Sequence, residues 1–235
     1  MSVLPVPVKI GNGRSASAVD LGALEVASLA LESAPATEVV RWASERYGDG
    51  LVVAASFQDS VLVDVVANAA PQVEVVFLDT QYHFPETLVY MEQVRLRYGL
   101  NLRVVRPEVE ADDRWRHDPD GCCRVRKIEP LRRALAGKVA WISGLRRADS
   151  PSRAVAPVVG YDLARQAVKV NPLATWSDDD VAAHVAARDL PAHPLAAAGY
   201  ASIGCWPCTR PVGEGEQARA GRWSGSTKTE CGLHG

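Results

Sequence analysis

The sequence has no excess of positive charge and no long apolar run. Its 26 Lys and Arg against 28 Asp and Glu give a formal net charge of -2, whereas proteins that bind polyanions usually carry a clear basic excess. No apolar run reaches the ~20 residues needed to cross a bilayer, and residues 1–20 lack the charged-then-apolar order of a signal peptide. We therefore expect no nucleic-acid partner, no membrane partner and a cytoplasmic location.

Cysteine is also scarce, but the few cysteines are grouped. Cys122 and Cys123 are adjacent, Cys205 and Cys208 form a CxxC pair, and Cys231 stands alone. In a reducing compartment such pairs hold metal or perform redox chemistry rather than form structural disulfides. Two half-sites far apart in a chain can close one site, and the spacing suits zinc and an iron–sulfur cluster about equally. Burial of the adjacent pair as small hydrophobic residues is the alternative.

A four-thiolate site is complete with four cysteines, which leaves Cys231 free for chemistry. It lies in a polar C-terminal segment, where burial in a core is not expected. Its thiol would be mostly protonated near neutral pH unless nearby cations stabilise the thiolate. Such cations are close in sequence, at Arg219, Arg222, Lys228 and His234. The pattern favours a nucleophile that meets a polyanionic substrate, and an incidental terminal cysteine is the alternative.

Short β-branched runs alternate with helical patterns through the middle of the chain. The runs that we expect as strands are residues 51–55, 73–78, 102–105 and 139–142. The expected helices are residues 21–33, 37–47, 59–69, 85–98, 122–136 and 175–188. This alternation predicts an α/β fold with a mainly parallel sheet and helices on both faces.

The composition divides the chain into three parts. Residues 1–20 are rich in Pro, Gly and Ser and are expected to form a loose N-terminal arm. Residues 21–208 form the α/β domain, because 235 residues with 47% hydrophobic content suffice for one sizeable core. Residues 209–235 are dominated by Gly, Glu, Ser and Arg and are predicted to be a mobile tail.

In an open parallel sheet, ligands bind beyond the carboxyl ends of the strands. The residues near these ends that we expect to contact a ligand are Ser56, Leu78, Asp79, Thr80, Arg146 and Arg147. A helix N-terminus after Ser56 could hold an anion, although the loop has no glycine and ordinary capping by Ser56 or Asp59 is the alternative. Paired guanidiniums suit phosphate or sulfate, with a solvated basic loop as the alternative.

Several of these motifs occur together in one known family. They are residues 78–80 (LDT), 83–87 (HFPET), 122–127 (CCRVRK), 144–147 (GLRR), 202–209 (SIGCWPCT) and 228–234 (KTECGLH). In this order they closely resemble the assimilatory adenylyl-sulfate reductases of the PAPS/APS reductase family. The resemblance covers nearly everything from residue 51 to residue 234, although the segment 56–60 departs from the glycine-containing loop of many members.

The resemblance implies an adenine nucleotide α-hydrolase-like fold and the reduction of adenosine 5′-phosphosulfate (APS) to sulfite and AMP by thioredoxin. This reaction serves sulfate assimilation and cysteine biosynthesis. Cys231 matches the nucleophile that carries an S-sulfonate, and Lys127 matches a lysine between cluster and substrate. The residues that match phosphosulfate contacts of the tail are Arg219, Arg222 and His234. The residues that match the ligands of one 4Fe-4S cluster are Cys122, Cys123, Cys205 and Cys208.

Two other functions remain open from the sequence. A reductase of 3′-phosphoadenylyl sulfate (PAPS) has the same terminal motif, although members without the four cluster cysteines typically prefer that substrate. A nucleotide-binding or RNA-modifying protein with a structural zinc site is an alternative of another class, but it leaves Cys231 without a role. Whether the chain forms a homo-oligomer is also open.

Overall fold

The computed structural model describes residues 19–224 and 228–233, so most of the expected N-terminal arm and His234 lie outside the described residues. The strands are β1 (Leu51–Ala54), β2 (Glu74–Leu78), β3 (Leu102–Val105), β4 (Ala140–Ser143), β5 (Val159–Asp162) and β6 (Ala167–Val170). The α-helices are α1 (Leu21–Ala30), α2 (Ala36–Tyr47), α3 (Val61–Ala69), α4 (Pro85–Tyr98), α5 (Arg114–His117), α6 (Pro119–Cys123), α7 (Glu129–Ala134) and α8 (Asp178–Ala187). No helix in the described ranges is both long and apolar enough to cross a membrane.

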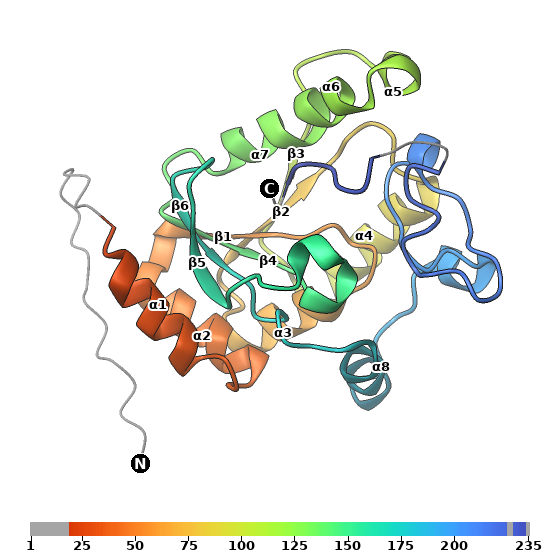
Figure 1. The fold of residues 1–235 in the computed structure, drawn as a ribbon. Helices are drawn as coiled ribbons and strands as arrows, with labels where there is room; N and C mark the ends of the chain where they lie inside the picture. Colours follow the sequence, from red (N-terminus) through yellow and green to blue (C-terminus); the bar gives the residue numbers. More distant parts are fainter. Residues whose placement is uncertain (1–18, 225–227, 234–235) are drawn as a thin grey trace.

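The strands form one sheet in the order β3-β2-β1-β4-β6-β5 (Figure 1). Neighbouring strands are parallel except at the edge, where β5 pairs antiparallel with β6. The chain runs outward from β1 through β2 to β3 and then returns to the other side of β1 at β4. This reversal creates a topological switch point between β1 and β4, which is where open α/β sheets bind ligands.

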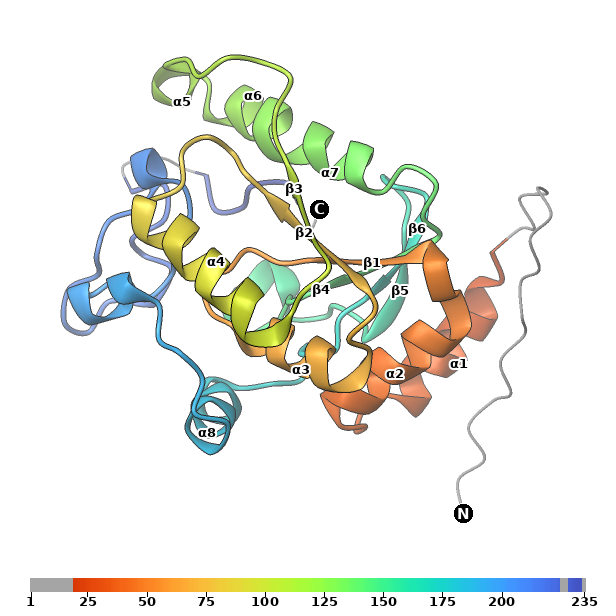
Figure 2. The same ribbon diagram turned by 180° about the vertical axis from the view of Figure 1, so that it is seen from behind.

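Alternate strand residues face two separate hydrophobic clusters. Val53 and Val75 belong to the larger cluster, which also contains residues of α1, α2, α3 and α4. Val52, Val76 and Trp141 belong to the smaller one, which contains residues of α7. The view from behind shows α7 on the opposite side of the sheet from α2 and α3 (Figure 2). Because side chains alternate along a strand, each face of the sheet buries its own apolar set.

The predicted α/β class and mainly parallel sheet are confirmed, and β1 to β4 lie within or one residue beyond the expected runs. The hairpin of β5 and β6 was missed by the sequence analysis. Each of its strands has only four residues, and both include polar or glycine positions such as Gly160 and Lys169. Their strand conformation depends on pairing with each other and with β4, because strand preference is strongly context-dependent.

Candidate functional site

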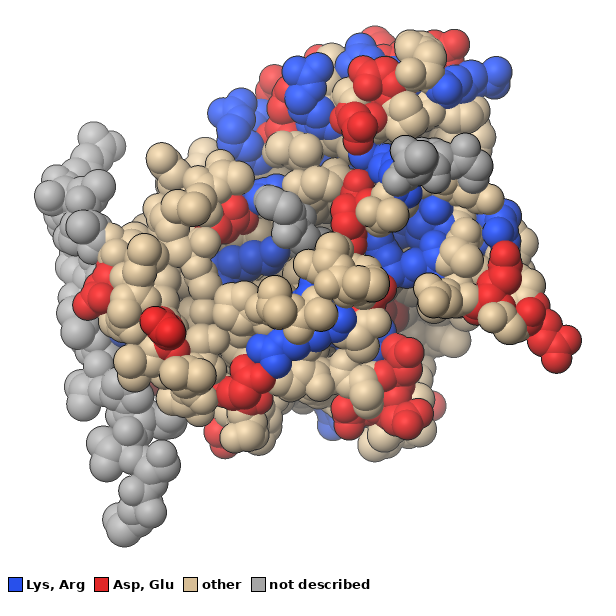
Figure 3. Space-filling model, viewed as in Figure 1, with Lys and Arg blue, Asp and Glu red and all other residues tan. Residues whose placement is uncertain are grey.

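A cavity of about 700 Å³ lies at the carboxyl ends of β1, β2 and β4. Its walls come from the loops after these strands, from the segment around Gly204 and from the C-terminal segment that carries Cys231. This volume is in the range of small-molecule and cofactor sites. On the face shown in Figure 3, Lys and Arg side chains gather in the hollowed middle of the surface. The cavity therefore suits a small anionic ligand at the switch point of the sheet.

The loop after β1 contributes Ser56 to the cavity wall. Phe57, which follows it, has φ 54, a left-handed conformation that glycine adopts more easily. The Phe57 ring is buried and packs edge-on against Phe77 with 5.5 Å between ring centroids. Asp59 Oδ1 accepts from Val61 N at 3.0 Å, a contact with the first residue of α3 from the position before its N-cap, Ser60. The loop thus adopts a left-handed backbone conformation at Phe57 without a glycine, and the ring of the same residue is buried.

Of the three site residues expected at the end of β2, two line the cavity and one does not. Leu78 and Thr80 line the cavity. Asp79 is not among the lining residues and instead accepts from Gln81 N at 3.0 Å and Arg106 Nε at 2.9 Å. Its carboxylate therefore shapes the turn after β2, and a contact of Asp79 with a ligand stays a prediction.

The basic loop after β4 lines the cavity, but its arginines are occupied by acidic partners. Arg146 Nη2 lies 2.9 Å from Asp149 Oδ1 and 2.8 Å from Asp178 Oδ1. Arg147 pairs with both carboxylate oxygens of Glu32, with Nη2 to Oε2 at 3.0 Å, and its Nε donates to a backbone carbonyl. Carboxylates thus neutralise both guanidiniums at this wall. Their predicted contacts with a ligand are not tested by this arrangement.

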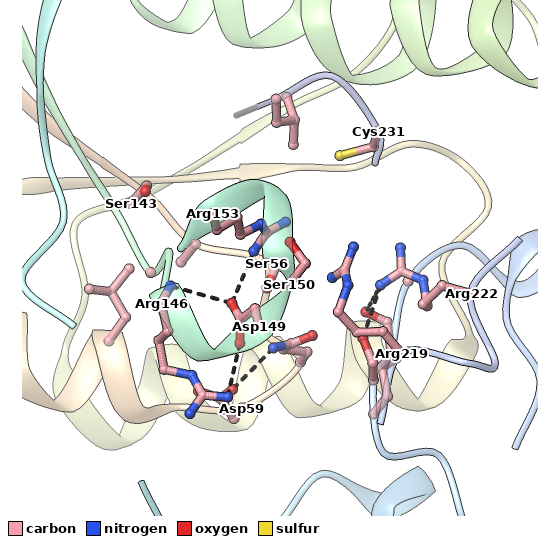
Figure 4. Close-up of a pocket in the computed structure, with 18 of the residues that line it drawn as sticks. Ser56, Asp59, Ser143, Arg146, Asp149, Ser150, Arg153, Arg219, Arg222 and Cys231 are labelled. Atoms are coloured by element: carbon pink, nitrogen blue, oxygen red, sulfur yellow. Dashed lines mark hydrogen bonds and ion pairs between the residues drawn. The ribbon is translucent and has the colours of Figure 1, made fainter. Parts of the chain in front are cut away.

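Cys231 is buried, contrary to the expectation from its polar sequence context, with 9% of its surface exposed. It packs with Trp223 and Cys123 and lines the cavity, where the close-up shows it across from Arg146 and Asp59 (Figure 4). Burial opposes ionisation of its thiol, but the Lys127 ammonium, a hydrogen bond from the backbone of Leu233 and the Arg222 guanidinium lower the pKa below its usual value. This favours a buried, activated thiol rather than an incidental terminal residue.

Lys127 reaches the cavity from a π-helical segment (Arg124–Ile128) that joins α6 to α7. It follows Cys123 by four residues, which places both side chains on one helix face. Burial would lower the Lys127 pKa, but the electrostatic influence of the neighbouring Cys205 and Cys231 sulfurs raises it above its usual value. The structure therefore keeps a cation beside the candidate nucleophile.

Arg222 provides a second cation on the same side of the cavity. Its Nη1 donates to Ser202 Oγ at 3.3 Å and to the Ile203 carbonyl at 3.4 Å, and the guanidinium lies 4.7 Å from the Trp223 ring centroid. A β-carbon at Gly204 would collide with this guanidinium. Gly204 is thus required for the close approach of Arg222, a role that the sequence analysis did not assign.

The four expected ligand thiols line a second, small cavity next to Lys127 and Trp223. All four are free, and Thr80 Oγ1 lies 3.3 Å from Cys205 Sγ. Burial raises the pKa of Cys123 to about 11 and also raises those of Cys122 and Cys208. Among the described residues, no three Cys, His, Asp or Glu side chains are arranged to hold one metal ion. The structure brings the four thiols together without defining a single-ion site.

Two further residues of this cavity were not assigned by the sequence analysis. Arg153 belongs to the basic loop after β4, and Glu230 precedes Cys231. The two form an ion pair at 2.7 Å within the cavity wall. The basic loop was visible in the sequence, but no sequence signal indicates which carboxylate pairs with Arg153, because the two residues are 77 positions apart.

Comparison with known proteins assigns the family. The phosphoadenosine phosphosulfate reductase domain matches residues 50–211. An adenosine 5′-phosphosulfate reductase from Streptomyces coelicolor is 48% identical, covering 90% of this chain and 93% of its own length. A phosphoadenylyl-sulfate reductase from Candida auris, solved as a phosphate complex, superimposes with a TM-score of 0.73 and 26% identity, covering 82% of this chain and 98% of its own.

The fold extends to more distant nucleotide enzymes. An FMN adenylyltransferase from Candida glabrata has a TM-score of 0.58 at 14% identity, covers 83% of this chain and 69% of its own, and shows a likeness of fold alone. The match over residues 50–211 and the near full-length similarity to the Streptomyces protein confirm the resemblance drawn from the motifs. The chain belongs to the phosphoadenosine phosphosulfate reductase family.

Proposed function

We propose that this protein reduces adenosine 5′-phosphosulfate to sulfite and AMP, as part of sulfate assimilation and cysteine biosynthesis. The observation that carries the proposal is the placement of Cys231 in the wall of the switch-point cavity, with Lys127 and Arg222 beside it. Similar proteins named adenosine 5′-phosphosulfate reductase support the choice of substrate.

In the first step, the Cys231 thiolate attacks the sulfonyl sulfur of the nucleotide. The bond between this sulfur and the bridging phosphate oxygen breaks, and AMP leaves with the electron pair, so the enzyme carries a Cys231 S-sulfonate. Lys127 and Arg222 would stabilise the negative charge that moves toward the phosphate. Arg219 also lines the cavity, and His234, outside the described residues, remains a predicted contact.

In the second step, a thiolate of reduced thioredoxin attacks Cys231 Sγ, and sulfite leaves with the electron pair of the sulfur–sulfur bond. The second thioredoxin thiol then resolves the mixed disulfide. Thioredoxin is thereby oxidised to its disulfide by two electrons, and the transferred sulfur is reduced from the sulfate to the sulfite level. Since Cys231 is buried, this step requires the tail to open, which agrees with the predicted mobility of residues 209–235.

We further propose that Cys122, Cys123, Cys205 and Cys208 hold one 4Fe-4S cluster. Four free thiols share one cavity, and two of them are adjacent in the chain, an arrangement that suits a cluster with several metal atoms better than one compact zinc ion. When bound, the cluster would supply a structural crosslink and an electrostatic field next to Lys127. The proposed reaction takes place in the cytoplasm and needs neither nucleic acid nor a membrane.

The nucleotide preference needs a direct comparison, because the family description and the Candida auris structure name the 3′-phosphorylated substrate. The test is sulfite release from each nucleotide by cluster-loaded enzyme with reduced thioredoxin. We expect turnover with adenosine 5′-phosphosulfate and little with its 3′-phosphorylated form. Comparable turnover of both would refute the proposed preference.

Replacement of the nucleophile tests the chemistry itself. Cys231→Ser should retain AMP binding and a native far-UV spectrum, while mass spectrometry after incubation with the nucleotide, without thioredoxin, should find no protein mass increase equal to one sulfonate. The unaltered protein should carry this adduct on the peptide that contains Cys231. An adduct in the Ser variant would show that another residue is the acceptor.

A further inference from the structure

Glu230 occupies the residue position before Cys231 and holds two cations of the cavity wall. Its Oε1 accepts from Arg153 Nε at 2.9 Å and its Oε2 accepts from Arg153 Nη2 at 2.7 Å, which is a bidentate pair. Arg219 Nη2 donates to Oε2 at 3.3 Å, and Ser150 Oγ donates to Oε1 at 3.1 Å. A bidentate guanidinium pair fixes orientation as well as distance. Glu230 is therefore held in one orientation by Arg153 and Ser150, outside the tail, and by Arg219, within it.

The Arg153 end of this contact is firmly anchored. The Arg153 side chain is only 9% exposed, and its Nη1 donates to Asp149 Oδ2 at 2.9 Å. Asp149 in turn pairs with Arg146. Opposite charges thus alternate from the loop after β4 to Glu230. Figure 4 marks two of these contacts, from Arg146 and from Arg153 to Asp149, with dashed lines. If Glu230 moved away, the largely buried Arg153 guanidinium would keep only Asp149 as a carboxylate partner.

Contacts on both sides hold Cys231 in place. On one side are the ion pairs of Glu230, and on the other the Gly232 carbonyl accepts from Arg165 Nη2 at 2.9 Å. The second contact uses backbone and is not specific to a side chain of the tail. Of these two contacts, only the charged one depends on the identity of a tail side chain, and Lys228 adds a second such contact by pairing with Asp120.

We propose that Glu230 is a positioning residue that closes the tail and places Cys231 in the cavity through its ion pairs with Arg153 and Arg219. The Glu230 carboxylate binds guanidiniums that line the substrate cavity. An incoming phosphosulfate would therefore compete with Glu230 for the same cations. This makes closure of the tail depend on charge, and it links closure to the anion that occupies the cavity. The inference rests on the proposed role of Cys231 as nucleophile.

The variant that tests this is Glu230→Gln, which keeps the size of the side chain and removes its charge. The matched control is Glu216→Gln, which breaks a bidentate pair with Arg210 in the same tail segment but away from the cavity. Iodoacetamide alkylation is followed on the tryptic peptide that begins at Thr229, in cluster-loaded protein without nucleotide. Because the Glu230 charge also raises the Cys231 pKa, the rates are compared at a pH where the thiol is fully ionised in both proteins. There we expect Cys231 of Glu230→Gln to react roughly tenfold faster or more, whereas Glu216→Gln reacts like the unaltered protein.

Two further measurements separate positioning from a general structural role. Added salt should accelerate alkylation of Cys231 only modestly in the unaltered protein, because Arg153 and Glu230 are largely buried, and still less in Glu230→Gln. In single turnover at saturating nucleotide, Glu230→Gln should form the S-sulfonate more slowly, while its AMP affinity stays equal or increases because a competing anion is gone.

An unchanged alkylation rate in Glu230→Gln, or a loss of AMP binding, would overturn the inference. Alkylation does not depend on sulfite formation, so these outcomes differ from a failure of the proposed function, in which the unaltered protein itself would form no adduct on Cys231.

Discussion

The two walls of the cavity use cations in different ways. At the wall formed by the loop after β4, Arg146, Arg147 and Arg153 each pair with carboxylates. At the wall next to the cysteines, neither Lys127 nor Arg222 forms an ion pair with a carboxylate of residues 19–224 or 228–233. Both walls carry cations in the sequence. At the second wall, an anion from solution meets Lys127 and Arg222 without having to displace a described carboxylate, whereas at the first wall it would compete with one.

This difference indicates separate tasks for the two walls. Paired arginines form a rigid frame, since each guanidinium is fixed by partners on other segments. Cations without a carboxylate partner are held in place by nearby hydrogen bonds and rings instead, as Arg222 is by Ser202 and Trp223. Negative charge that develops during the reaction should therefore be stabilised mainly at the wall next to the cysteines.

The sharpest test of this comparison removes one cation from each wall. Lys127→Met keeps most of the side-chain length and should lower kcat/KM for the nucleotide by about 10²- to 10³-fold, as loss of one preorganised charge contact does. The matched variant Arg147→Met should change kcat/KM by less than about threefold, because Glu32 already neutralises Arg147. Steady-state sulfite release measures both, with iron and sulfide content as a check that the cluster is retained. Equal losses in the two variants would remove the distinction between the walls.

A smaller effect is expected when a cation is displaced rather than removed. In Gly204→Ala, the new β-carbon collides with Arg222 and should push the guanidinium away from its present position. Misplacement of this kind should lower kcat/KM by roughly tenfold to a hundredfold. Gly213→Ala is the matched control, because a β-carbon there makes only ordinary contacts, with Glu216. Full activity in Gly204→Ala with an unchanged melting temperature would show that the position of Arg222 does not matter.

The smallest effect concerns protein stability, through the ion pairs at the wall formed by the loop after β4. The hydrogen bond from Arg147 lowers the Glu32 pKa, with burial acting against it. A lowered pKa in the folded state contributes stability above the unfolded value of about 4.3, and this contribution is lost as the pH falls through the folded value. Since the Glu32 side chain is 44% exposed, the ion pair should contribute only about 0.5 kcal/mol.

Urea unfolding of the unaltered protein and of Glu32→Gln at pH 7 and near the acid limit of folding measures this contribution. Glu32→Gln should be slightly less stable at pH 7, and the difference should shrink in acid. A difference that grows as the pH falls would contradict the lowered pKa and with it the view of this wall as an ion-paired frame.

The sequence was sufficient for the elements that carry a strong local pattern. The runs that became β1, β2 and β4 are apolar and bounded by polar loops, so both their positions and the edge at which their loops meet could be predicted. The β5–β6 hairpin could not be predicted, because its short strands depend on partners far away along the chain. The hydrophobic role of the tail was also missed, since Trp223 is buried where Cys123, from a distant segment, packs with Cys231 and Leu233 of the tail.

The sequence by itself determined which chemistry is available: four cysteines in two pairs, one further thiol and several cations near strand ends. Only the tertiary structure decided which of these groups can act. It placed Cys231 in a buried site beside Lys127, and it paired Arg147 with Glu32 across 115 positions while leaving Arg222 without a described carboxylate partner. The physical reason is that the state of a charge depends on the groups that surround it in space, and chain packing brings those groups from remote parts of the sequence.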